Sequence, residues 1–284
     1  MTVITDQMTD QTIKRVAFTM GFVLLVSLGL ARASMASAYQ EVPVKNGGTV
    51  TGRAWLDGPI PEPRIFPLAL YPFGPYCNKN ERITDGGGNI RIQEFEVGAS
   101  HGLKDVVVAV QGVKRGKPFT PIVAEIVARD CEFIPFVSIV QNQGQFRMIN
   151  DDPIIHNAQL YQSEKGNLRL TVPNPPNSTG TFPISFERKY RIYQMICGMH
   201  EFMQTWGYAV DNPYYALTDE NGAFTIDGLP PGTYTVTAWR PHFRLMEQRV
   251  TIAPNGTARI EFPFDATTVK RPLYETQERF RIQR

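Results

Sequence analysis

Short runs of β-branched and aromatic residues, separated by glycine and proline, make up most of the chain after residue 38. Residues 106–110, 133–140 and 206–210 are such runs. Residues of these types favour strands, and Gly and Pro between them favour turns. The chain contains 23 Gly and 22 Pro, and no long helical period is visible beyond its N-terminus. The pattern therefore predicts an all-β protein with a sizeable core.

The first 38 residues have the pattern of an export signal. Lys14 and Arg15 precede an apolar run at residues 16–31, and Ala36-Ser37-Ala38 is a small-x-small cleavage site. The run is shorter than the roughly 20 residues of a membrane span. We expect a signal peptide over residues 1–38, and an uncleaved N-terminal anchor, with membrane association, is the alternative. Both place the globular part outside the cytoplasm, in the periplasm or otherwise exported.

Residues 197–203 read Cys-Gly-Met-His-Glu-Phe-Met. They gather a thiol, an imidazole and two thioethers, and His156 supplies a second imidazole from upstream. One thiolate, two imidazoles and one weak thioether are the ligands of a blue-type copper site. We expect His156, Cys197 and His200 to surround one copper ion in a trigonal plane, with Met203 as the axial ligand. Zinc, another ion or no metal at all are the alternatives.

Strand patterns explain how these residues would meet. Residues 190–196 predict a strand that ends at Cys197. His156 is expected on a neighbouring strand, after a turn at residues 150–153. Asn157 would then hydrogen-bond the Cys197 loop and hold the two loops together.

The motifs His156-Asn157 and Cys197-x-x-His200 resemble those of a cupredoxin, the plastocyanin and pseudoazurin kind of Greek-key β-barrel. The resemblance covers roughly residues 130–210 and implies one type 1 copper and a redox partner protein that docks near it. In plastocyanin-like proteins the axial methionine lies farther after the histidine than Met203 does here. The spacing resembles the binuclear copper centre of oxidase subunits, but such a centre needs a second cysteine where this chain has Tyr193. A mononuclear site is therefore expected.

Met199 is the rival axial ligand. Its side chain would have to fold back over a two-residue turn, so we expect it to point outward and form an apolar docking face with Phe202. A copper enzyme of this fold would need further histidines, and only His101 and His242 remain. We expect both to be surface residues, so no enzyme activity and no small-molecule substrate are predicted.

Cys77 and Cys131 are the remaining cysteines. In an exported protein two cysteines outside the metal site usually pair, so we expect a disulfide, and two buried thiols are the alternative. This bridge would join an N-terminal β module, residues 46–128, to a copper domain, residues 129–211.

A different pattern begins after residue 211. Residues 213–264 include Asn221-Gly222 and Pro230-Pro231-Gly232 turns between alternating strands. This segment resembles the carboxypeptidase regulatory-like, transthyretin-type β-sandwich. Residues 50–58 resemble the first strand of the same family, so the sandwich is expected to be completed by the N-terminal module. Residues 265–284 would form a polar tail.

Two functions follow from these patterns. The first is an exported mononuclear copper protein that serves as an electron carrier or redox subunit. The second is a copper-handling or structural module without an electron-transfer role, with the sandwich as its interaction surface. The net charge of +2 gives no basis for nucleic-acid binding.

Overall fold

The computed structural model describes residues 39–162, 166–186 and 191–271. The expected signal peptide at residues 1–38 and most of the expected tail lie outside the described residues. The described residues form strands and a few short helical turns, which confirms the prediction of an all-β fold.

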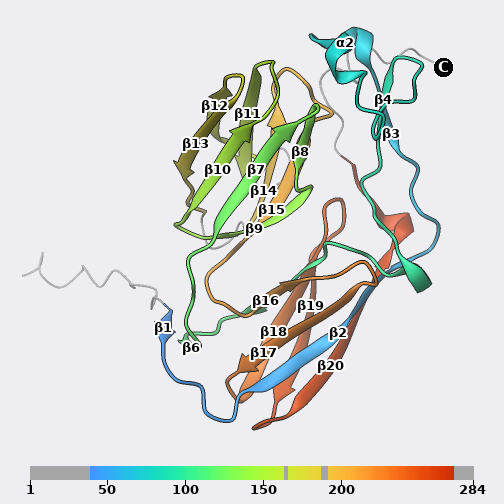
Figure 1. The fold of residues 1–284 in the computed structure, drawn as a ribbon. Helices are drawn as coiled ribbons and strands as arrows, with labels where there is room; N and C mark the ends of the chain where they lie inside the picture. The colour runs from blue at the N-terminus through green and yellow to red at the C-terminus, as the bar shows by residue number, and fades with distance from the viewer. Residues whose placement is uncertain (1–38, 163–165, 187–190, 272–284) are drawn as a thin grey trace, which may run out of the picture. The chain divides into compact units, whose positions relative to one another are not determined.

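The middle of the chain forms two facing sheets, which we call the copper module (Figure 1). One sheet has the order β13-β10-β7-β8 and the other β12-β11-β14-β15-β9. The sheets are open and face each other as a sandwich, where a closed barrel was expected. The first sheet starts before residue 129, because its strand β7 begins at Val123. The strands are β7 (Val123–Arg129), β8 (Glu132–Ile134), β9 (Val137–Gln141), β10 (Gln145–Asn150), β11 (His156–Gln162), β12 (Leu168–Asn174), β13 (Ser178–Pro183), β14 (Ile192–Cys197) and β15 (Gln204–Val210).

Strand burial in this module follows from what covers each face. Strand β11 alternates between buried and half-buried residues, as expected for a strand with one face on a core. Every residue of β15 is buried. Ala209 packs into the core between the two sheets, whereas Trp206 and Tyr208 pack with Trp239 in a separate apolar cluster. Both faces of β15 are therefore covered.

The chain segments on either side of the copper module share a second pair of sheets (Figure 1). Their orders are β16-β5-β18-β19 and β17-β2-β20. Strand β2 lies between β17 and β20, and β5 lies between β16 and β18, so each sheet combines early and late parts of the chain. The strands are β2 (Gly48–Asp57), β5 (Val107–Gln111), β16 (Tyr215–Leu217), β17 (Ala223–Leu229), β18 (Gly232–Trp239), β19 (Met246–Ile252) and β20 (Thr257–Asp265).

The segment between β2 and β5 packs against the copper module. Residues 59–75 are rich in proline but contain ordered elements, and Phe66 and Leu68 are buried in the copper module's core. The burial of the segment's apolar side chains orders it in spite of its proline content. Its elements are β3 (Arg64–Pro67), η1 (Leu68–Leu70), α2 (Gly74–Cys77), β4 (Asn89–Ile92) and η2 (Ala99–His101); the short pair β1 (Gln40–Glu41) and β6 (Arg115–Gly116) and the turn η3 (Ala266–Thr268) complete the described elements.

Candidate metal centre

The structure brings His156, Cys197 and His200 together at one end of the copper module. His156 is the first residue of β11, and Cys197 is the last residue of the adjacent strand β14. The Cys197 Sγ lies 3.8 Å from Nδ1 of His156 and 3.7 Å from Nδ1 of His200. All three side chains are fully buried. Among the described residues they form the group of His, Cys and acidic side chains placed to hold one ion, with ligand atoms within 4.8 Å of one another.

These distances fit a metal ion in a trigonal plane. Bonds of about 2.0 Å to imidazole nitrogen and about 2.3 Å to thiolate sulfur, at 120° to each other, separate nitrogen from sulfur by about 3.7 Å. The observed separations of 3.8 and 3.7 Å match this value. One thiolate and two imidazoles form a donor set typical of a blue-type copper site.

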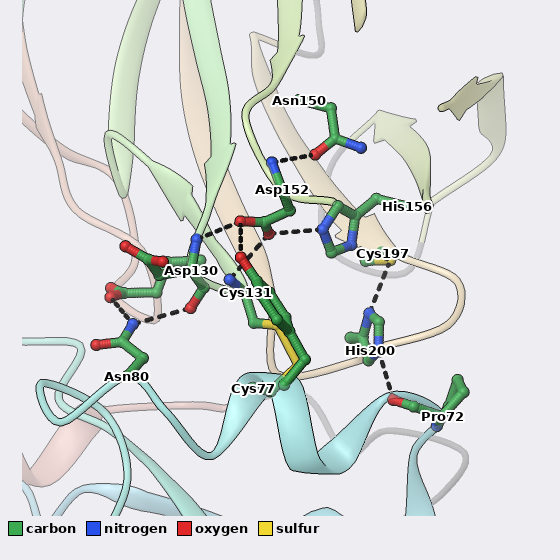
Figure 2. Close-up of a disulfide and its surroundings, with 12 residues drawn as sticks. Pro72, Cys77, Asn80, Asp130, Cys131, Asn150, Asp152, His156, Cys197 and His200 are labelled. Atoms are coloured by element: carbon green, nitrogen blue, oxygen red, sulfur yellow. Dashed lines mark hydrogen bonds and ion pairs between the residues drawn. A yellow bond between two sulfur atoms is a disulfide. The ribbon is translucent and has the colours of Figure 1, made fainter. Parts of the chain in front are cut away.

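Hydrogen bonds hold both imidazole rings with Nδ1 toward the sulfur (Figure 2). Nε2 of His200 donates to the carbonyl oxygen of Pro72 over 2.9 Å, and Nε2 of His156 lies 2.8 Å from an oxygen of Asp152. A carbonyl and a carboxylate only accept, so each Nε2 carries the proton. In its neutral form each ring therefore presents an unprotonated Nδ1 atom, as metal ligation requires.

Asp152 connects His156 to three other groups. Asp152 is 1% exposed. Its carboxylate accepts hydrogen bonds from the backbone N–H groups of Asp130 and Cys131 and from the Tyr76 hydroxyl. Sequence reasoning assigned Asp152 only to a turn and missed this role. Its position four residues before His156, in the turn that leads into β11, was the available signal, because a carboxylate at that position can reach the imidazole.

The ionisation of the metal-free site favours a thiolate. Burial raises the pKa of Cys197, but its contacts with His156, His200 and the Asn157 N–H outweigh it and lower this pKa to about 6. Burial lowers the pKa of His156, but its contacts with Asp152 and Cys197 outweigh that effect and raise it to about 9. At neutral pH a thiolate thus faces an imidazolium, and a metal ion that binds here releases the imidazolium proton.

Asn157 joins the two loops through its backbone. Its N–H points to the Cys197 Sγ over 3.5 Å, and its carbonyl accepts from the Gly198 N–H over 2.7 Å. The side-chain Oδ1 is buried and has no hydrogen-bond partner among the described residues. The expected link between the loops therefore exists, but it is made by the main chain and would survive a change of side chain.

The loop after Cys197 is a closed turn. The Cys197 N–H donates to the carbonyl of Met203 over 3.0 Å, and the Met203 N–H donates to the carbonyl of His200 over 2.8 Å. Met203 is buried and Met199 is partly buried. Phe202 was expected on an outward docking face with Met199, but it is 1% exposed because it packs against aromatic rings and His200 inside the core.

The two remaining histidines differ from each other. His101 is exposed, as expected. His242 was expected at the surface but is 1% exposed, with Nε2 3.0 Å from the carboxylate of Glu94. Glu94 is itself buried and needs charged or donating partners, which explains why a histidine lies inside the protein at this position.

A disulfide joins Cys77 on α2 to Cys131, which directly precedes β8 (Figure 2). Their Cα atoms are 5.4 Å apart. The Cys131 N–H donates to Asp152. The bridge thus fixes the segment before β4 beside the metal centre.

The family model of the carboxypeptidase regulatory-like domain matches residues 209–265. These residues are a carboxypeptidase regulatory-like domain. The match covers β16 to β20, and in the structure two earlier strands, β2 and β5, pair into the sheets of this carboxypeptidase regulatory-like domain. No curated protein matches the chain.

Solved structures that resemble this chain include copper proteins. A purple cupredoxin from Nitrosopumilus maritimus is 15% identical, with a TM-score of 0.27, over 31% of this chain and 99% of its own. Amicyanin from Paracoccus versutus is 11% identical, with a TM-score of 0.27, over 36% of this chain and 97% of its own. A copper-containing nitrite reductase from Thermus scotoductus SA-01 is 14% identical, with a TM-score of 0.28, over 34% of this chain and only 24% of its own.

In the part of the chain that the structure describes, no helix has both the length and the apolar character needed to cross a bilayer.

Proposed function

We propose that this chain is an exported mononuclear copper protein that carries single electrons. The observation that carries the proposal is the arrangement of the Cys197 Sγ and the Nδ1 atoms of His156 and His200, at separations of 3.8 and 3.7 Å. Copper bound by this donor set supplies one-electron chemistry between Cu(I) and Cu(II).

The protein's contribution is a rigid set of ligands. His156 is held by the carboxylate of Asp152, and His200 by the carbonyl of Pro72. Cys197 is held by the N–H of Asn157 and by its place in a hydrogen-bonded strand pair. Ligands that cannot rearrange keep one geometry for both oxidation states, which suits electron transfer.

Met203 is proposed as the axial ligand. Its backbone closes the loop that carries Cys197 and His200, and its residue is 1% exposed. The burial of Met203 supports a weak thioether contact, whereas Met199 is only partly buried.

Export through residues 1–38 and a redox partner protein that docks near the copper site are parts of the same proposal. The Cys77–Cys131 disulfide supports export, because such bridges persist in oxidising compartments. Edman sequencing of the protein from the periplasm tests cleavage. A mature chain that starts at Tyr39 is expected, and an intact N-terminus in the membrane fraction would show an anchor.

The function is tested by the absorption and paramagnetic resonance spectra of the copper-loaded protein. We expect one copper per chain, a strong thiolate-to-copper band and reversible redox cycling. His156→Ala should loosen the metal, and His101→Ala, which changes an exposed histidine, is the matched control. Weak, colourless Cu(I) binding would instead assign the chain to copper handling.

A further inference from the structure

A short segment from outside the copper module covers the metal centre. This covering segment, residues 72–77, includes α2 and lies against His200 (Figure 2). The Pro72 carbonyl accepts from His200, and the Phe73 ring lies with its centroid 6.3 Å from that of His200. At its far end Tyr76 donates to Asp152, and Cys77 is bonded to Cys131.

The ligands are fully buried on the side where the covering segment contacts His200. His156, Cys197 and His200 have 0% exposure, whereas Phe73 is 41% exposed. Phe73 therefore faces solvent with one part of its ring and a proposed copper ligand with another.

The backbone at Phe73 is unusual for an aromatic residue. Its φ of 56° and ψ of 21° are left-handed values, which bulky residues rarely adopt. Such a conformation persists only where the surroundings hold it in place. Here the hydrogen bond to Pro72 precedes Phe73, and the disulfide at Cys77 follows it. The ring is thus held over His200 by fixed points on both sides.

We propose that Phe73 is a specificity-determining residue. Its ring prevents small exogenous ligands from reaching the metal but does not prevent electron transfer. The proposal rests on the function proposed above. An exogenous ligand needs a path to the metal, and the Phe73 ring blocks the side of His200 on which the covering segment lies. An electron needs no such path, because it can cross a short layer of packed atoms. The site is then restricted to electron transfer by a residue far from its ligands in sequence.

The first test uses the metal-free protein and does not depend on copper. Cys197 is the free cysteine, so its alkylation by iodoacetamide reports access to the centre. Phe73→Gly removes the ring, and glycine suits the left-handed backbone, so the fold should be kept. We expect alkylation at least tenfold faster than in the wild-type protein. The control is Ile65→Ala, which truncates a 46% exposed side chain on β3 and should change the rate less than twofold.

Three results of the alkylation test would overturn the proposal. The first is a wild-type alkylation rate in Phe73→Gly, with a thermal unfolding midpoint that shows the variant is folded. The second is an equal acceleration in Ile65→Ala, which would indicate general loosening. Phe73→Leu, which retains an apolar cover, should stay close to wild type, and an acceleration like that of Phe73→Gly would also contradict a covering role.

The second test uses the copper-loaded protein. Added azide or imidazole should leave the wild-type spectrum unchanged and alter that of Phe73→Gly. If both spectra respond equally, Phe73 does not close the site. If alkylation behaves as expected but copper gives no thiolate band in the wild-type protein, the proposed function fails while the covering role of Phe73 stands.

Discussion

Removing the Cys77–Cys131 bridge should destabilise the protein strongly and loosen the metal centre. The bridged residues are 54 positions apart, so the bridge closes a loop in the unfolded chain and lowers the entropy of that state. Without this constraint, the double variant Cys77→Ala, Cys131→Ala is expected to lose about 4 kcal/mol of unfolding free energy. Both cysteines are fully buried, so the truncation adds a small packing cost. Alanine at 131 retains the backbone N–H that donates to Asp152.

Urea denaturation of the metal-free protein measures this effect. The wild-type protein in strong reductant should approach the stability of the double variant, and the variant itself should not respond to reductant. Because Cys77 ends the covering segment, alkylation of Cys197 should also accelerate in the double variant. A loss below 1 kcal/mol, or a double variant that still responds to reductant, would refute the assignment of this stabilisation to the bridge.

Three further predictions concern single residues. Cys197→Ser should abolish the thiolate-to-copper absorption while far-ultraviolet circular dichroism stays the same; a retained band would exclude Cys197 as the ligand. Met203→Leu should keep copper and colour but raise the reduction potential in voltammetry, because losing an axial donor destabilises Cu(II); if Met199→Leu shifts the potential instead, the axial ligand is Met199. Burial raises the pKa of Glu94, but His242 and nearby arginines outweigh this effect and lower the pKa. The charged carboxylate therefore stabilises the fold at pH values above its unfolded pKa of about 4.3. This contribution is lost as the pH falls through the lower pKa of the folded state. The stability advantage of wild type over Glu94→Gln in urea should therefore be large at pH 7 and shrink at pH 3, and an equal difference at both would contradict this coupling.

The sequence predicted the structure correctly wherever a feature lies within one strand and the turn next to it. The run before Cys197 identified β14, and the spacing Cys197-x-x-His200 identified two groups that the structure places together. The alternation and turns of residues 213–264 identified the carboxypeptidase regulatory-like segment. In each case the residues involved are neighbours in sequence as well as in space.

The sequence was less informative wherever distant segments meet. The carbonyl of Pro72 bonds His200 across 128 positions, and no local pattern reveals such a contact. Phe202 was expected on an outward docking face with Met199, and His242 was expected at the surface. Each is buried by residues from elsewhere, Phe202 by Tyr71 and His242 by Glu94. The cover over the centre therefore emerges only from tertiary packing.

The pairing of β2 has a consequence for the order in which the chain can fold. Both neighbours of β2 come late, since Thr51 on β2 meets Phe224 across 173 positions and β20 starts at Thr257. During synthesis, which starts at the N-terminus, β2 must stay unpaired until the whole copper module has been made. Strands β7 to β15 pair only with one another, so they can assemble first. Closing so long a loop is slow unless an intervening part has already condensed. Strands β5 and β16 flank the copper module and pair directly with each other. A copper module that has already folded would bring these two strands close together before β20 is available, and would thus speed the pairing of the early and late strands.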